Sequence, residues 1–112
     1  MIDQARVVDL VAISDKEREV TFEIIDHFSW RQDELWHLQL LQDKLNYYLD
    51  VLDSGDVYNK VPKAKIYKVI IEITGLYPLS KAAEEFLAKA KNVIETLGFE
   101  LKFRLSPNAK TD

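Results

Sequence analysis

The sequence contains no cysteine and only 3 glycines and 3 prolines among its 112 residues. Without cysteine, the chain has no disulfide, no thiol nucleophile and no thiolate metal ligand. Its few glycines form no glycine-rich loop of the kind that cradles phosphate. No apolar run approaches the ~18 residues of a membrane span, and the N-terminal residues have neither the basic start nor the apolar stretch of a signal peptide. We therefore expect a cytoplasmic protein that does not enter a membrane.

The charge is acidic, with a net value of −4, and it is unevenly distributed. Residues 1–56 carry 13 acidic and 5 basic side chains, whereas residues 57–112 carry 6 acidic and 10 basic ones. A nucleic-acid partner is not expected, because neutralising phosphates requires clustered lysine and arginine. The four lysines within residues 60–68 are interpreted as guards of a sheet edge rather than a single-strand binding site. The acidic half is either an ordinary solvated surface or one that attracts a basic partner.

The pattern of apolar residues predicts one α+β domain over residues 1–105, followed by a polar tail over residues 106–112. Four segments of alternating apolar residues are typical of strands, and they lie at 8–13, 20–25, 67–73 and 99–105. Two segments with helical periodicity lie between them, at 33–53 and between Ser80 and Gly98. The expected order is ββαβαβ, a two-layer sandwich in which a four-stranded sheet has both helices on one face.

The helix predicted at 33–53 has two apolar stripes. The main stripe consists of residues that recur at spacings of three and four: Leu38, Leu41, Leu45, Tyr48, Leu49 and Leu52. A second stripe lies about opposite, at ~100° per residue, and consists of Trp36, Leu40, Tyr47 and Val51. One domain core accounts for the first stripe only. The second is interpreted as an interface for a partner protein or a second copy, unless the loop at 56–65 folds over it.

The helix start and the strand before it contain the densest cluster of polar residues. The cluster comprises Asp26, His27, Glu34 and His37. Glu34 and His37 share a helix face, and a carboxylate with an imidazole can bind zinc or transfer protons. Asp26 and His27 point to opposite faces if they lie in a strand, so only one of them can join the helical pair. No metal or cofactor is assigned, because the alternative, a hydrogen-bonded junction that satisfies backbone groups, is favoured. Ser29 and Gln32 also fit a capping box, which would extend the helix back to Trp30.

Several longer phrases resemble a known family. They are IIDHFSW, QDKLNYYLDVLDSG and YPLSKAAEEFLAKAKNVIETLGFELKF. Together these phrases resemble a family of small bacterial proteins classed only as a domain of unknown function, with the likeness running from Val8 to Leu105. The resemblance implies a bacterial, cytoplasmic, stand-alone domain. It implies no activity and assigns no functional residue.

Two hypotheses of function follow from these observations. The first is a non-enzymatic protein-interaction module that associates with itself or binds and neutralises a partner, as immunity proteins do. The second is a small metal-dependent or acid–base enzyme built on Asp26, Glu34 and His37. The absence of nucleophile and phosphate-binding motifs favours the first.

Overall fold

The four alternating segments form a single sheet in the computed structural model, which describes residues 1–111. The strands are β1 (Leu10–Ser14), β2 (Glu19–Asp26), β3 (Lys68–Gly75) and β4 (Glu100–Leu105), and they lie side by side in that order. The β1–β2 pair is antiparallel, as its short connecting turn requires, whereas β3 is parallel to both β2 and β4. The sheet is therefore mixed and has two free edges, β1 and β4.

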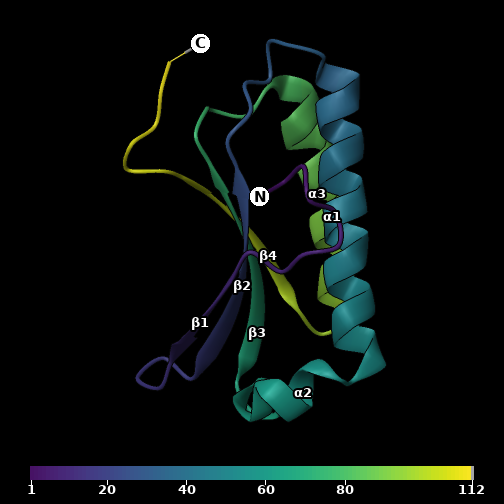
Figure 1. The fold of residues 1–112 in the computed structure, drawn as a ribbon, viewed down its shortest axis with the longest axis vertical. Coiled ribbons are helices and arrows are strands. Elements are labelled where there is room, and N and C mark those ends of the chain that lie inside the picture. The colour runs from purple at the N-terminus through teal and green to yellow at the C-terminus, as the bar shows by residue number, and fades with distance from the viewer. Residues whose placement is uncertain (112) are drawn as a thin grey trace.

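Helices cover one face of this sheet (Figure 1). The long helix α1 (Glu34–Ser54) connects β2 to the lower end of the molecule, and α3 (Lys81–Thr96) connects β3 to β4. Between α1 and β3 the chain forms the short helix α2 (Val57–Lys60) and a 3₁₀ turn (Pro62–Lys65). None of the helices within residues 1–111 is long and apolar enough to cross a membrane.

The core lies between the sheet and the helices. Alternate residues of the central strands point into it, and all are at least 95% buried: Val20, Phe22, Ile24, Val69, Ile71 and Ile73. From α1 the main stripe contributes Leu41, Leu45, Tyr48 and Leu52, as predicted. The opposite face of the sheet bears no helix and has charged pairs instead, among them Lys68 with Glu100 and Arg104 with Glu72. The face under the helices is therefore uniformly apolar. The other face carries the charges, but it also holds the buried Ile70 (2% exposed).

The α+β class, the four strands and the two long helices are confirmed, but two local predictions are wrong. Helix α1 does not begin at Trp30, because Asp33 is its N-cap and accepts a hydrogen bond from the Trp36 amide (3.4 Å). The Ser29 hydroxyl instead accepts a hydrogen bond from the Arg31 amide (3.1 Å) in the preceding turn. The segment at 56–65 is also not a plain loop, since it contains α2 and the 3₁₀ turn. The element order therefore contains a third helix that ββαβαβ omits.

The first nine residues form an arm that crosses from the sheet to α1 before it turns into β1 (Figure 1). Ile2, at 0% exposure, is part of the core, and its amide donates a hydrogen bond to the Ile25 carbonyl (2.9 Å). At the other end of the chain, the Lys110 amide donates to the Leu76 carbonyl (2.8 Å). Of the predicted tail at 106–112, residue 112 lies outside the described residues.

Candidate functional site

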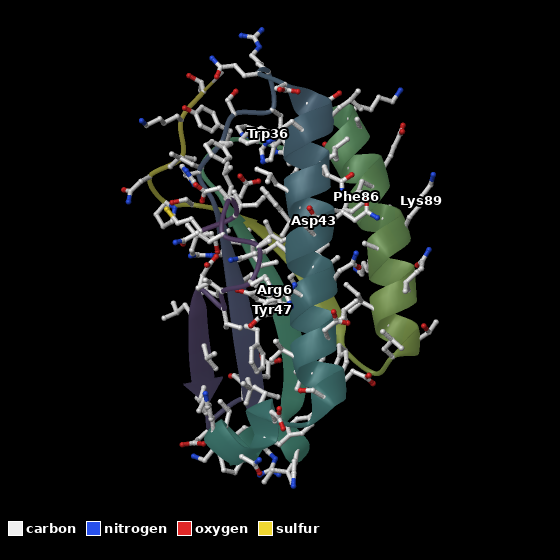
Figure 2. The ribbon with its side chains drawn as sticks, turned by 45° about the vertical axis from the view of Figure 1, so that its right-hand side comes forward. Arg6, Trp36, Asp43, Tyr47, Phe86 and Lys89 are labelled. Carbon is white, nitrogen blue, oxygen red and sulfur yellow. The ribbon has the colours of Figure 1, made fainter. Side chains whose placement is uncertain are left out.

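Of the second stripe of α1, Tyr47 lies beside the arm, where Arg6 approaches its ring, and Trp36 lies nearer the N-terminal end of the helix (Figure 2). Trp36 is 47% exposed, and its ring centroid lies 5.2 Å from that of Phe28. Leu40 and Tyr47 are half-buried and pack against the edge of the core. Val51 is also half-buried. The protein's own chain therefore covers this stripe in part and leaves the rest at the surface.

Tyr47 and Val51 line a hollow of about 390 Å³. The arm, β1, β2 and α2 supply its other apolar residues, which are Val8, Val11, Phe22, Val57 and Val61. Its polar residues are Ser54, Asp56 and Lys60, all exposed. An apolar hollow of this size with a few polar groups beside it has the character of a small binding pocket. The alternative in which the segment at 56–65 folds over the stripe holds only in part, because α2 forms one wall of the hollow.

Charged groups surround Tyr47 on the helix surface. Asp43 and Asp50 lie one turn before and one turn after it, so their carboxylates flank the ring on the same side of α1. The Arg6 guanidinium carbon lies 5.8 Å from the centroid of the Tyr47 ring, so a cation from the arm covers part of this aromatic surface (Figure 2). The surface beside the hollow is thus acidic, apart from Arg6 and Lys60.

A fully buried lysine holds the arm that forms one wall of this hollow. The Lys44 ammonium is 0% exposed and donates to the carbonyls of Met1 (3.1 Å), Gln4 (2.7 Å) and Val7 (2.6 Å). It also pairs with Asp9 at 2.8 Å. An ammonium removed from water requires a full set of acceptors, and here the arm supplies them. Lys44 thereby ties residues 1–9 to the middle of α1.

The Lys44 ammonium and its four acceptors form a buried cluster that we call the Lys44 cage. Asp9 is the anion of this cage. Its carboxylate accepts hydrogen bonds from the Met1 amino group (2.8 Å) and the Ile25 amide (2.9 Å) in addition to Lys44. Burial raises the pKa of Asp9, but the hydrogen bonds from Lys44, the amino group and the Ile25 amide outweigh it and hold the pKa below its ordinary value. The Asp9 amide donates to the Tyr48 hydroxyl (2.9 Å), which in turn donates to the Glu23 carbonyl (2.5 Å). Burial raises the pKa of the Tyr48 hydroxyl far above its ordinary value.

Lys44 is not among the site residues predicted from the sequence. The available signal was a lysine inside the main apolar stripe, with Leu41 three residues before it, Leu45 next to it and Tyr48 four residues after it. A lysine at such a position is normally interpreted as lying at the edge of the stripe, with its ammonium group in water. Its acceptors are backbone carbonyls of the arm, and no side-chain pattern in the sequence reports where those lie.

The predicted polar cluster is brought together in part. His37 Nε2 lies 2.8 and 2.7 Å from the two carboxylate oxygens of Asp26, and the side chains are 0% and 2% exposed. Trp30 stacks on the imidazole with ring centroids 3.5 Å apart, and Phe28 meets it edge-on at 6.0 Å. The other imidazole nitrogen, Nδ1, is buried and has no hydrogen-bond partner among residues 1–111. The arrangement is a buried carboxylate–imidazole pair within an aromatic enclosure.

His27 and Glu34 remain outside this pair. The His27 ring lies beside Phe28, with centroids 4.0 Å apart, and of the two consecutive residues it is Asp26 that contacts the helical histidine. Glu34 lies half-buried in the first turn of α1 and is not among the hydrogen-bonding partners of His37. Across residues 1–111, no group of three or more histidine, cysteine, aspartate or glutamate side chains is arranged to hold a metal ion.

The chain matches the family of unknown function DUF6572 over residues 1–107. No curated protein and no solved structure matches it.

Proposed function

Since the chain belongs to this family of unknown function, which supplies no activity to carry over, we propose from its own surface that it is a non-enzymatic protein-interaction module. It binds a partner protein at the hollow lined by Tyr47 and Val51. We place this function in the bacterial cytoplasm, where binding would neutralise or regulate the partner, as an immunity protein does. The observation that carries the proposal is the apolar hollow between α1, α2 and β1, with exposed polar groups beside it.

The hollow favours a particular chemistry in the partner. Its walls are aliphatic and aromatic, so they suit an apolar side chain of the kind that forms the buried anchor of an interface. The carboxylates of Asp43, Asp50 and Asp56 beside it favour basic residues around that anchor. The partner is therefore a protein with an apolar side chain flanked by lysine or arginine.

A cross-linking experiment identifies this partner by position. A photoreactive benzoylphenylalanine replaces Lys60, an exposed residue that lines the hollow, and in a matched variant it replaces Lys89, which points away on α3 (Figure 2). The proposal expects one protein to be captured from position 60 and not from position 89. Equal capture from both positions, or none from position 60, would contradict it.

Binding of the purified partner then tests the chemistry. Tyr47→Asp is expected to weaken binding at least about tenfold, because it places a charge against the apolar anchor. The matched control is Leu35→Asp, which introduces the same charge on the same helix at a residue that is 81% exposed. Asp50→Lys is a second disruption at an exposed position, with Glu85→Lys on α3 as its control. Full affinity in both Tyr47→Asp and Asp50→Lys would refute the site even if one variant folded poorly.

A second candidate, a small metal-dependent or acid–base enzyme using Asp26, Glu34 and His37, is favoured by one observation. The imidazole of His37 is oriented through Nε2 by a carboxylate, and Nδ1 has no partner, which is how a histidine that transfers protons is held. His37 is 0% exposed, however, and the rings of Trp30 and Phe28 pack against its imidazole. A substrate therefore reaches His37 only if one of these rings moves. Metal analysis tests the metal-dependent form: stoichiometric zinc that is lost in His37→Ala supports it, and metal-free protein with an unchanged Tm in chelator opposes it.

A further inference from the structure

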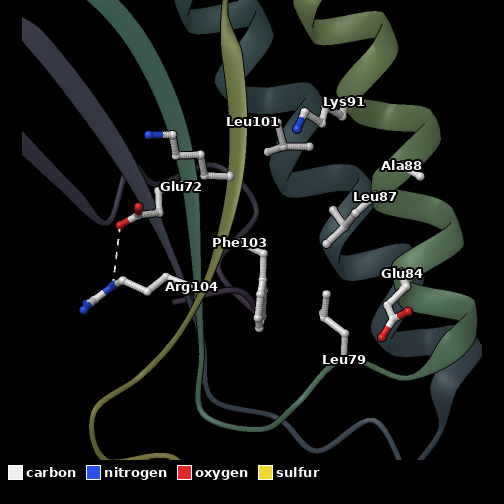
Figure 3. Close-up of a pocket in the computed structure, with 10 residues that line it drawn as sticks. Glu72, Leu79, Glu84, Leu87, Ala88, Lys91, Leu101, Phe103 and Arg104 are labelled. Carbon is white, nitrogen blue, oxygen red and sulfur yellow. Dashed lines mark ion pairs between the residues drawn. The ribbon is translucent and has the colours of Figure 1, made fainter.

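The free edge at β4 lies beside a hollow. β4 is the last strand of the sheet, so within residues 1–111 only one of its two edges is hydrogen-bonded to another strand. Between β4 and α3 lies a groove of about 580 Å³ whose apolar residues are Leu79, Leu87, Leu101 and Phe103 (Figure 3). An unpaired strand beside an apolar groove is a place where another chain can add to a sheet.

Charges on the α3 side of this groove follow a symmetric pattern. Glu84 and Lys91 are both exposed and both line the groove, and neither takes part in an ion pair within the part of the chain that the structure describes. They are seven residues apart, so they lie on one helix face about 10 Å from each other. Ala88 lies between them and, with a one-carbon side chain, leaves room for a close approach (Figure 3). The face thus has a negative end, a small centre and a positive end.

The strand beside it repeats the pattern. Glu100 and Arg104 of β4 carry opposite charges and flank Lys102 symmetrically. A two-fold axis exchanges the two ends of an element, so each negative end meets the positive end of the other copy. The other edge strand, β1, has the sequence LVAIS and carries no charge, so it has no comparable pattern.

From these two patterns we infer that the groove between β4 and α3 is the interface with a second copy of this chain. The two β4 strands pair antiparallel, and the sheets join into one of eight strands, four from each copy. The two α3 helices then lie antiparallel, with Glu84 of one copy beside Lys91 of the other, twice. Across the strands Glu100 faces Arg104, and Leu101 packs beside Phe103. The two Lys102 side chains meet at the axis, and each has Glu100 of its own strand 3.5 Å away to offset the repulsion.

This interface differs from the partner site proposed above. The hollow beside Tyr47 is built on α1, α2 and β1, whereas the groove is built on α3 and the two strands at the opposite edge of the sheet. The dimer therefore leaves both partner sites accessible. Failure of either proposal does not affect the other.

Sedimentation equilibrium of the purified full chain tests the dimer. The chain has a mass of 13.0 kDa, and at tens of micromolar in moderate salt we expect a species of about twice that mass. Glu84→Lys and Lys91→Glu each place like charges opposite one another, so each is expected to weaken dimerisation at least about tenfold. The double variant Glu84→Lys/Lys91→Glu restores opposite charges at both contacts and is expected to recover the dimer.

Matched controls lie on the same helix. Glu85→Lys and Lys89→Glu make the same changes in charge at exposed residues that do not line the groove, and they are expected to leave the dimer unchanged. Ala88→Arg, at the centre of the groove, provides a second disruption that does not depend on the charge pattern. A wild-type chain that stays monomeric would overturn the proposal. A dimer that Ala88→Arg and both single charge reversals leave intact would overturn it too, as would a double variant that stays monomeric.

Discussion

Helix α1 buries two basic side chains against aspartates, and the two pairs differ in how completely their polar atoms are bonded. His37 and Lys44 are seven residues apart, so they lie two turns apart on the same face of the helix. Each is 0% exposed, and each contacts the carboxylate of an aspartate from an earlier part of the chain. The helix thus has a buried carboxylate–imidazole pair toward its N-terminal end and a buried ion pair near its middle.

The side chains of Lys44 and His37 differ in their hydrogen-bond partners. The Lys44 ammonium has four acceptors, three of them backbone carbonyls, and Asp9 has three donors. Within residues 1–111 the His37 side chain has one hydrogen-bond partner, Asp26, and its Nδ1 atom has none, while aromatic rings pack around the imidazole. Asp26 accepts one further hydrogen bond, from the Phe28 amide (3.1 Å).

The Lys44 cage therefore acts as a structural clamp, whereas the Asp26–His37 pair could be replaced by apolar residues without loss of the fold. A buried group with every polar atom bonded fixes the backbone that supplies its partners, and here that backbone is the arm. A buried pair that is bonded mainly to itself fixes less, and replacing both members by apolar residues is often neutral. The Lys44 cage therefore shapes the molecule, and through the arm it shapes the wall of the hollow beside Tyr47.

The largest effect is expected from Lys44→Met. The substitution keeps an unbranched side chain but leaves the Asp9 carboxylate and three carbonyls without their central donor. We expect a loss of about 3–5 kcal/mol in the free energy of unfolding, measured by urea denaturation. Hydrogen exchange should show the loss of protection at the Ile2 amide before that of the central strands. A loss below about 1 kcal/mol would contradict the clamp.

His37→Leu tests the other half of the comparison. Alone it leaves the Asp26 carboxylate buried, with the Phe28 amide as its remaining donor within residues 1–111, so we expect a loss of about 3 kcal/mol. The double variant Asp26→Leu/His37→Leu removes the charge as well and should recover more than half of that loss. The same pairwise replacement of Asp9 and Lys44 should recover little, because three carbonyls of the arm stay unbonded. Equal recovery at both sites would remove the distinction.

Asp9→Asn is expected to have a smaller effect that depends on pH. The pKa of Asp9 lies below its ordinary value in the folded chain, so its ionised form stabilises the fold above about pH 4. This stabilisation is lost as the pH falls through the pKa of the folded state. We expect a loss of about 2 kcal/mol at pH 7 that shrinks at pH 3, measured as the difference between wild-type and variant urea midpoints. A difference that does not change with pH would show that the charge of Asp9 contributes nothing.

Phe28→Leu is expected to have the smallest effect. The ring of Phe28 is half-buried and contacts the rings of Trp36 and His37 edge-on or tilted. Its removal should lower the free energy of unfolding by about 1 kcal/mol, the contribution typical of one aromatic contact. A much larger loss in thermal or urea denaturation would mean that the aromatic enclosure, rather than the Asp26–His37 pair, fixes this end of α1.

Much of the fold could be predicted because the ends of its helices are marked by cap residues that can be recognised in the local sequence. Ser80 is the N-cap of α3, and its hydroxyl accepts a hydrogen bond from the Ala83 amide (3.1 Å). Gly55 ends α1 with φ at 80°, in the left-handed region that favours glycine. The start of α1 was misassigned because Ser29 and Gln32 match a capping box by residue type alone. Asp33, four residues on, competes for the same role and takes it.

The candidate site was less predictable, for a physical reason. Periodicity places Tyr47 and Val51 on one face of α1 but does not reveal that the arm and α2 turn that face into a hollow. Asp26 and His37 could be nominated because a strand end and the following helix start are close in sequence. Lys44 could not, since its partners are 35–43 residues away and most of them are backbone atoms.

One calorimetric comparison tests whether the surface beside Tyr47, and not the buried Asp26–His37 pair, carries the function. The partner captured through position 60 is titrated into the wild type, Tyr47→Asp and Asp26→Leu/His37→Leu. We expect Tyr47→Asp to weaken binding at least about tenfold and the double variant to bind with the wild-type Kd. Normal binding by Tyr47→Asp together with loss of binding in the double variant would show that the buried pair, and not this surface, carries the function.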